Sequence, residues 1–235
     1  FGARVFSGVI TDETMMDNDP TLAAQYLPAR LGLMQGAQAD IIWDGDNFGF
    51  TASVGTAYET NTVLGAVSGG LLDMGNGNTV YVDSEFRYSP SDKISFKLRS
   101  TFARTVADAS GEFILGLSEI DSNAFAFGMD AGNFSFSVSQ PLAITRGYLQ
   151  YPYANYDVVD LGDGKYDLNI TDMHIENVDL SPIHREVRFT GEYRHNFGDF
   201  TDGVIGFIYR VNPNNTDVFG NESVFMMKLT HRLGI

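Results

Sequence analysis

Long stretches in which apolar and polar residues alternate one by one constrain this sequence more than any other feature. The clearest stretch covers residues 93–105, and two more follow at 186–197 and 223–235. Side chains of a strand point alternately to its two faces, so each stretch predicts a long, two-faced β-strand. Shorter or weaker alternations extend the prediction to about ten to thirteen strands, at 31–43, 48–58, 80–88, 123–130, 134–140 and 205–211, with uncertain ones at 4–10, 111–117, 148–158 and 166–175.

Turn-forming residues separate these stretches in the manner of hairpins. Gly, Asp, Asn or Pro occurs in segments 44–47, 89–92, 130–133, 162–164 and 198–203, where tight reversals need such residues. One short helix is expected at 19–27, since Asp19 can cap it, Pro20 suits its first position and Pro28 ends it. The sequence therefore predicts an all-β, antiparallel meander in one domain over residues 1–235, with 1–30 as an N-terminal strand, loop or plug segment.

The composition narrows the class of protein. The formal net charge of -15 disfavours a nucleic-acid binder, because phosphate contacts need a basic surface. The absence of cysteine excludes disulfides, thiolate metal sites and thiol nucleophiles. Apolar runs reach only about five residues, whereas a membrane-spanning helix needs about 20. A helical membrane protein is thereby excluded, but a membrane β-barrel is not, because its strands alternate.

Strand length and charge placement favour a barrel that crosses a membrane. A strand over residues 93–105 would reach about 43 Å, or about 30 Å when tilted near 45°. Charged residues lie opposite the apolar face of the strands, with Arg104 and His231 as exceptions. We therefore predict a transmembrane β-barrel of about 10–12 strands. Its interior would be lined by Asp83, Glu85, Arg87, Lys97, Arg99, Arg188, Glu192, Arg194, Arg210, Lys228 and Arg232.

These interior charges have two interpretations. The basic residues could form a conduit for anions or hold an internal segment. We expect instead that they pair with Asp83, Glu85 and Glu192, because charges removed from water need partners. A barrel of this size is narrow, so side chains or a plug would mostly fill it.

The last segment has the pattern of a membrane-inserting strand. Its apolar residues recur at every second position and resemble the terminal strand signal of bacterial outer-membrane barrels. They are Phe225, Met227, Leu229, Leu233 and Ile235. The segment departs from that signal because it ends in Ile235 where Phe is usual and because it places His231 on the lipid side. Tyrosines near strand ends suit an interfacial girdle, although they are common in any β-protein.

Several phrases resemble a known family. Segments 101–130, 134–152, 184–199 and 207–215 resemble the C-terminal region of secreted subtilisin-like serine peptidases of Gram-negative bacteria, which are organised like autotransporters. The phrase SVSQPL at 137–142 is the most distinctive. The resemblance covers residues 80–229 and implies an outer-membrane barrel that anchors an N-terminal passenger peptidase and assists its export. Its partners would be membrane lipid, lipopolysaccharide, the barrel-assembly machinery and the passenger.

The peptidase chemistry itself is not expected in this chain. The phrases that carry a subtilisin-type triad do not occur, and none of His174, His184, His195 and His231 has a nucleophile pattern nearby. We predict that the chain is not an enzyme. Its opening residues lack the basic leader and apolar core of a signal peptide, so the numbering is expected to begin on a mature or trimmed fragment.

Acidic clusters invite a calcium site but do not predict one. They lie at 12–19, 44–46 and 157–167, and no glutamate is spaced as the twelfth ligand of a calcium-binding loop. Solvated turns are the favoured account, so no metal and no cofactor is predicted. Two rivals to the translocator remain open: a stand-alone small outer-membrane channel or structural barrel, and a soluble surface β-sandwich that assembles through exposed strands.

Overall fold

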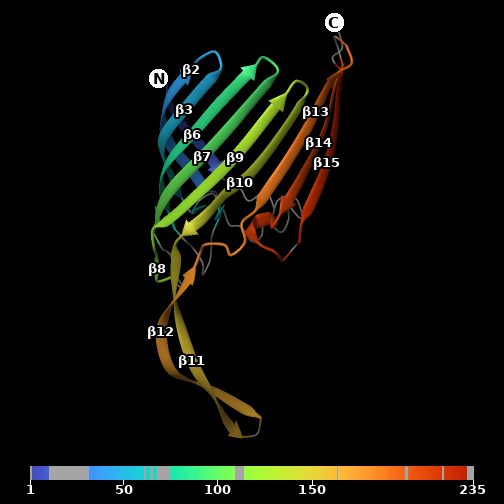
Figure 1. Cartoon of the computed structure of the whole chain (residues 1–235). Helices are drawn as coiled ribbons and strands as arrows, with labels where there is room; N and C mark the ends of the chain where they lie inside the picture. Colours follow the sequence, from blue (N-terminus) through green and yellow to red (C-terminus); the bar gives the residue numbers. More distant parts are fainter. Residues whose placement is uncertain are drawn as a thin grey trace.

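A ten-stranded antiparallel sheet dominates the protein (Figure 1). The computed structural model describes residues 2–10, 32–60, 62–63, 66–67, 75–108, 114–162, 164–198, 201–218 and 220–231. The sheet has the order β1-β2-β3-β6-β7-β9-β10-β13-β14-β15. Its strands are β1 (Gly2–Ile10), β2 (Gly32–Asp44), β3 (Phe48–Thr60), β6 (Gly77–Ser91), β7 (Ile94–Ala107), β9 (Ile120–Ala131), β10 (Phe134–Arg146), β13 (Val187–Asn196), β14 (Thr201–Val211) and β15 (Glu222–His231).

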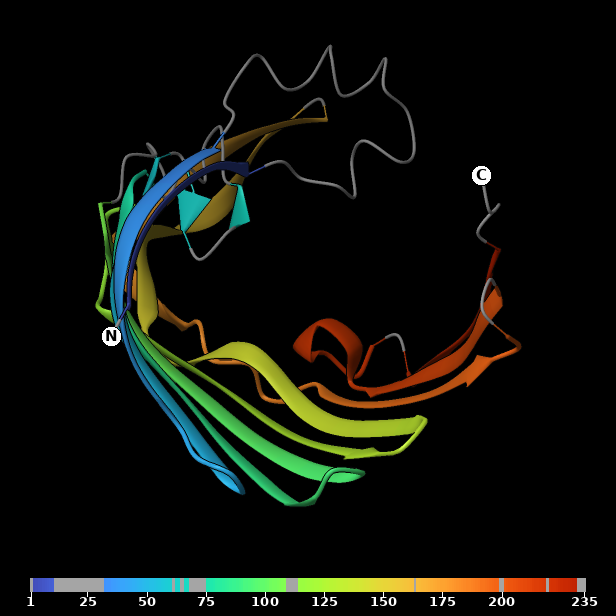
Figure 2. The same ribbon diagram turned by 90° about the horizontal axis from the view of Figure 1, so that it is seen from above.

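The sheet is strongly curved but open. Viewed from above, it bends into a trough whose two edges are β1 and β15 (Figure 2). Each strand pairs with its sheet neighbours in an antiparallel ladder, and most ladders keep one register along their length. The prediction of an all-β, antiparallel architecture is confirmed, whereas the predicted closure into a barrel is not seen in the described residues.

The meander is interrupted where a long hairpin leaves the sheet. β11 (Tyr148–Gly162) and β12 (Lys165–Asp179) pair with each other and project well beyond the sheet (Figure 1). The short strand β8 (Gly116–Leu117) pairs with the base of β11. The predicted strands at 148–158 and 166–175 therefore exist, but they lie outside the main sheet.

Small elements complete the described structure. β4 (Thr62–Val63) pairs with β5 (Ala66–Val67), and a short 3-10 helix, η2 (Pro213–Asn215), follows β14 on the concave side of the sheet (Figure 2). The helix predicted at 19–27 lies outside the described residues. Within the described part of the chain, no helix is long and apolar enough to span a membrane.

The hairpin turns follow the predicted turn residues. The connection from β9 to β10 is the two-residue turn at Gly132, whose φ of 58° is a left-handed conformation that glycine adopts without steric cost. β2 meets β3 around Gly45, and β6 meets β7 at Asp92 and Lys93. These three pairs of strands, together with β13 and β14, have their connected ends at one end of the sheet (Figure 1).

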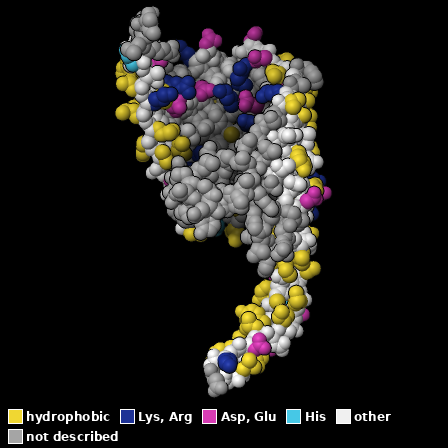
Figure 3. Space-filling view, turned by 180° about the vertical axis from the view of Figure 1, so that it is seen from behind, with side chains coloured by type: hydrophobic (Ala, Val, Ile, Leu, Met, Phe, Trp, Pro, Cys, Tyr) yellow, Lys and Arg dark blue, Asp and Glu magenta, His cyan; other side chains and the backbone are white. Residues whose placement is uncertain are grey.

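The strand register sorts side chains onto two different faces. One apolar row crosses eight strands through directly opposed residues, namely Trp43, Phe50, Phe86, Leu98, Phe127, Val138, Phe189 and Tyr209. One residue further along each strand, the opposed side chains are mostly polar, as in the row Thr51, Glu85, Arg99, Ala126, Ser139, Arg188, Arg210 and Glu222. The polar row belongs to the concave face, where charged side chains gather in the hollow (Figure 3).

Few apolar side chains of the sheet are buried. Those of the convex face remain 43% to 83% exposed at Ile41, Val54, Val82, Leu98, Phe102, Phe127, Ile205 and Met227. A small buried cluster, Ala107 and Ile120 with Leu117, Ile144 and Leu180 packed against it, lies where the long hairpin leaves the sheet. The sheet thus has no apolar core on its convex side within the described residues.

Candidate functional site on the concave face

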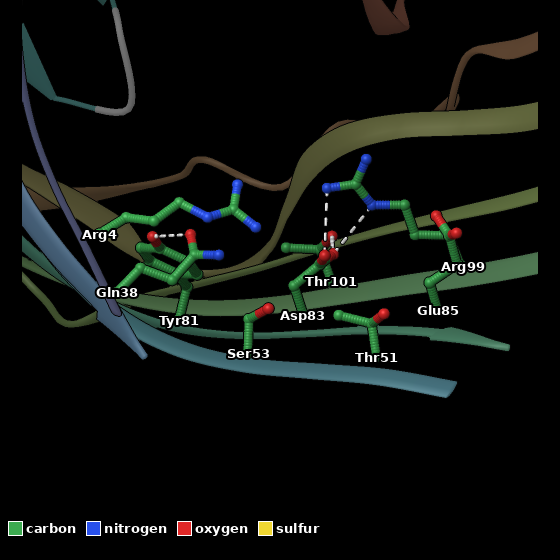
Figure 4. Close-up of a pocket in the computed structure, with 9 residues that line it drawn as sticks. All are labelled: Arg4, Gln38, Thr51, Ser53, Tyr81, Asp83, Glu85, Arg99 and Thr101. Atoms are coloured by element: carbon green, nitrogen blue, oxygen red, sulfur yellow. Dashed lines mark hydrogen bonds and ion pairs between the residues drawn. The ribbon is translucent and has the colours of Figure 1, made fainter. Parts of the chain in front are cut away.

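A polar cavity of about 360 Å³ lies against five neighbouring strands of the sheet (Figure 4). β1, β2, β3, β6 and β7 each contribute at least one side chain to it. The lining residues are Arg4, Gln38, Thr51, Ser53, Tyr81, Asp83, Glu85, Arg99 and Thr101. Three of the predicted interior residues, Asp83, Glu85 and Arg99, therefore meet in one place.

Asp83 is the acceptor of the best-defined network in this cavity. Arg99 on β7 donates from Nε to Oδ1 over 3.0 Å and from Nη2 to Oδ2 over 3.1 Å. Thr101 Oγ1 donates a third hydrogen bond to Oδ1 over 2.6 Å. Because a two-point contact between guanidinium and carboxylate fixes both groups, this network ties β6 to β7 and orients the Arg99 side chain across the cavity.

Asp40 on β2 is the acceptor of a second network at the cavity's edge. It is 1% exposed and receives a hydrogen bond from Ser53 Oγ over 2.8 Å. Arg4 Nε lies 2.9 Å from its Oδ2, and the Gln38 side-chain amide also donates to it. Partners from three strands therefore satisfy this buried carboxylate, as a charge removed from water requires.

Tyr81 reaches across a neighbouring strand because a glycine makes room for it. Its hydroxyl donates to Gln38 Oε1 over 2.8 Å, so the ring of a β6 residue extends over β3 to β2. Gly55 lies beneath that ring, and a Cβ atom placed there would come within 2.4 Å of the Tyr81 Cζ and hydroxyl oxygen. The contact between Tyr81 and Gly55 thus links three strands on the concave face.

Glu186 is the centre of another buried ion-pair cluster. It immediately precedes β13, and its side chain is 3% exposed. Arg188 Nη2 lies 3.0 Å from its Oε1, and Arg210 Nη2 lies 2.8 Å from its Oε2. The backbone N–H of Asn214 in η2 also donates to Oε2 over 2.8 Å. Hydrogen bonding from Arg210 lowers the pKa of Glu186 to about 2, so the carboxylate stays ionised.

The remaining predicted interior residues lie on the same face but apart from the cavity. Arg87 contacts Asp44 across Gly49, Lys97 Nζ lies 3.0 Å from Asp130, and Arg194 contacts Glu192. Lys228 lies on β15 directly opposite Val204. Arg232, with Leu233 and Ile235 of the predicted terminal strand, lies outside the described residues. Phe225, Met227 and Leu229 alternate on β15 with their side chains 81%, 83% and 69% exposed.

Among the described residues, six of the predicted basic residues form ion pairs and Lys228 forms none, and most of the partners are not those expected. Arg99 pairs with Asp83 and Arg194 with Glu192 as predicted. Glu85 lies directly opposite Arg99 in the register, yet among the described residues it forms no ion pair within 4 Å. The basic residues reach instead to Asp44, Asp130, Glu186 and Glu222.

Arg104 and His231, the polar residues predicted on the apolar face, also have polar partners. Arg104 Nε lies 2.7 Å from Asp121 Oδ1, and its Nη1 lies 3.5 Å from Glu119. His231 Nδ1 lies 2.8 Å from the hydroxyl of Thr201. Both predicted interruptions of the convex face therefore have polar partners close to a strand end.

Sequence reasoning missed Tyr81, Gln38 and Glu186 as site residues. Glu186 lies two residues before Arg188 on the same face and could have been identified as the first polar residue of the strand predicted at 186–197. Tyr81 and Gln38 are 43 residues apart, and nothing local indicates that they meet. Among the described residues, no group of three or more His, Asp or Glu side chains is arranged to hold a metal ion.

Fold and site together define an antiparallel all-β protein with an apolar convex face and a charged, mutually paired concave face. Comparisons with protein-family models, curated proteins and solved structures find no match for the chain. The resemblance to the C-terminal region of autotransporter-like peptidases accordingly stays a prediction.

Proposed function

We propose that this chain is the membrane-embedded β-barrel of a bacterial outer-membrane protein and serves to anchor and translocate an attached passenger. The observation that carries the proposal is the convex face, where an apolar row crosses eight strands and large side chains are exposed. Contiguous exposed apolar surface on this scale marks a site of contact with lipid or protein.

The strands have the length that a bilayer requires. β3 has 13 residues and β6 has 15. At about 3.4 Å per residue, 13 residues reach about 44 Å, which a tilt near 45° reduces to about 31 Å. An apolar exterior around a polar interior is the arrangement that outer-membrane barrels use.

The connections favour one orientation. Short turns join the strands at one end of the sheet, whereas the strand ends at the other end are connected by longer stretches of sequence, between β1 and β2, β3 and β6, β7 and β9, β10 and β13, and β14 and β15. Outer-membrane barrels have short periplasmic turns and longer extracellular loops. The start of β1 and the end of β15 both lie at the end of the sheet that has the short turns (Figure 1), and we assign this end to the periplasm.

A bilayer would also require that the two edges of the sheet close. Unpaired N–H and C=O groups cost several kcal/mol each in hydrocarbon, so open edges do not occur there. β1 and β15 are the first and last strands of an antiparallel sheet with ten members. In such a sheet they run antiparallel to each other, so their direct pairing would close a barrel without a further strand.

The position of β1 supports the proposed translocation. Because β1 starts at the proposed periplasmic end, a segment attached before β1 would reach the cell surface by passing along the charged concave face. The paired charges of Asp83, Arg99, Glu186 and Arg210 offer a hydrated lining to such a segment. A stand-alone barrel would share this lining but export nothing. A soluble sandwich would need a second sheet over the convex face.

The first expected result is that the sheet closes into a barrel in detergent, through pairing of β1 with β15. The chain has no cysteine, so Val5→Cys can be paired in turn with Phe225→Cys, Met227→Cys and Leu229→Cys, all on the convex side. We expect one pairing to form an intramolecular disulfide after refolding in micelles, because neighbouring strands bring Cα atoms within about 7 Å. Non-reducing electrophoresis and a mobility shift without boiling measure it. A chain that stays monodisperse without detergent, or that forms only intermolecular disulfides, contradicts the barrel.

Export of an attached segment is the second expected result. A short epitope placed before Phe1, behind a signal peptide, should become accessible to protease added outside intact Gram-negative cells. The matched control carries the epitope after Ile235, which the proposed orientation keeps in the periplasm. Equal protection of both epitopes in a membrane-inserted chain would favour the stand-alone barrel over the translocator.

A further inference from the structure

The β11–β12 hairpin carries two faces of opposite character outside the main sheet. The register places apolar residues opposite one another, with Val158 opposite Leu168, Tyr156 opposite Ile170 and Ala154 opposite Met173. The other face pairs Val159 with Asp167, Asp157 with Asn169 and Asn155 with Asp172. The hairpin thus has one mostly apolar face and one face on which acidic residues alternate with Tyr151 and Tyr153.

The apolar face is uncovered in the described structure. Tyr166, Leu168, Ile170, Met173 and Ile175 of β12 are between 59% and 67% exposed. Apolar side chains gather along the projecting hairpin (Figure 3). An isolated two-stranded hairpin is only marginally stable in water, so such a face is stabilised when another element covers it.

β12 also has a free backbone edge. In its three-stranded sheet the order is β12-β11-β8, so among the described residues the 15 residues of β12 pair on one side only. A long exposed edge offers a row of N–H and C=O groups to an added strand. The hairpin can therefore be extended at this edge by a further strand, whose side chains would lie beside the apolar face.

The charge of β12 selects among the strands that could be added. Its polar face carries Asp167, Asp172 and Glu176, with Lys165 and His174 on the same face. Within the described chain, His174 lies 3.8 Å from Asp172 and 3.1 Å from Glu176, and no Lys or Arg forms an ion pair with these three carboxylates. A second copy of β12 would bring like charges together, which is unfavourable in cross-strand positions. A strand with Lys or Arg at alternate positions would place its charges beside this row.

We propose that the edge of β12 binds an extended polypeptide segment in which apolar residues alternate with Lys or Arg. The backbone of the segment pairs with β12, its apolar side chains extend the face of Leu168 and Ile170, and its basic side chains lie beside Asp167, Asp172 and Glu176. Backbone pairing provides affinity, and the alternate side chains provide selectivity. This inference does not depend on whether the main sheet spans a membrane, because the hairpin lies outside it.

A peptide titration tests the proposal on the whole chain, refolded in zwitterionic micelles. The probe is a fluorescent eleven-residue peptide in which valine and lysine alternate, and fluorescence anisotropy reports binding. We expect a glutamate-for-lysine peptide, and a peptide with alternate backbone amides N-methylated, each to bind at least about tenfold more weakly. Equal binding of the N-methylated peptide would mean that charge alone attracts the probe, and would overturn the proposal.

Variants of the protein locate the site. Replacing the three β12 acids with Asp167→Asn, Asp172→Asn and Glu176→Gln should weaken binding about tenfold. The matched control, Asp46→Asn, Asp92→Asn and Asp217→Asn, removes the same charge from exposed turns and should leave binding unchanged. Equal loss in both variants would overturn the proposal. So would a dimer, seen by sedimentation, that excludes the peptide, since β12 would then bind a second copy.

Discussion

Replacing Glu186 with Gln should remove about 3 kcal/mol from the free energy of unfolding. The side chain is 3% exposed and contacts Arg188, Arg210 and the backbone N–H of Asn214. Removing one member of a buried ion pair leaves its partner charged and uncompensated, which costs about 3 to 5 kcal/mol. A pKa held at about 2 instead of 4.5 corresponds to a similar energy at neutral pH. Urea unfolding in micelles, followed by the fluorescence of the single residue Trp43, measures the loss.

Glu192→Gln is the matched control, since it also removes a carboxylate that contacts an arginine. Arg194 is 74% exposed, so water stabilises it after the change and the loss should stay below about 1 kcal/mol. Equal losses in the two variants would show that burial of Glu186 contributes nothing.

The same carboxylate should make stability depend on acid. The pKa of Glu186 is lower in the folded chain than in the unfolded chain, so the unfolded state binds the proton more readily at low pH. Its contribution is therefore fully present above about pH 4.5 and is lost as the pH falls toward about 2. The difference in unfolding free energy between the original chain and Glu186→Gln should shrink across that window. A constant difference between pH 5 and pH 2 would contradict the assignment.

Replacing Gly55 with Ala should cost about 1 to 3 kcal/mol, because the new methyl group would overlap the Tyr81 ring. The added Cβ would lie 2.4 Å from Cζ and 2.8 Å from Cε1 of that ring. Tyr81 cannot move aside without losing the hydrogen bond from its hydroxyl to Gln38. The expected result is a lower urea midpoint with an unchanged slope.

Gly128→Ala is the matched control on the same face of the sheet. Its added Cβ would meet its nearest atoms, Lys97 Cβ and the Phe136 carbonyl oxygen, at 3.9 Å, which is ordinary contact. The control should be neutral or slightly stabilising, because alanine restricts the unfolded chain more than glycine does. A double variant with Gly55→Ala and Tyr81→Ser should lose less than the sum of its parts if overlap is the cause. Additive losses would exclude overlap between the two side chains.

Much of the sheet could be predicted because strand parity is a local property. Residues 93–105 alternate so regularly that β7 and its two faces are evident, and the exposed apolar and paired charged residues follow that parity. The same parity shows that Arg104 is a charged residue on the apolar face, and Asp121 forms an ion pair with it. The turn at Gly132 was evident from its residue types.

The long hairpin could not be placed by the same reasoning. β11 and β12 alternate like the other strands, but their partners are each other and β8, while β10 pairs with β13 beyond them. Which strands pair depends on cross-strand contacts between residues far apart in the chain, and the alternation within one strand does not indicate those contacts.

The alternating pattern is thus sufficient to predict the strands and to say which of their two faces is apolar and which is polar, because successive side chains of a strand must point to opposite sides. The position of each charge within its network depends on long-range register. Tyr81 meets Gln38 over Gly55, and Glu186 holds Arg210 and Asn214, because pairing and curvature bring distant strands together. Such contacts join residues that only folding brings together, so no local sequence pattern indicates them.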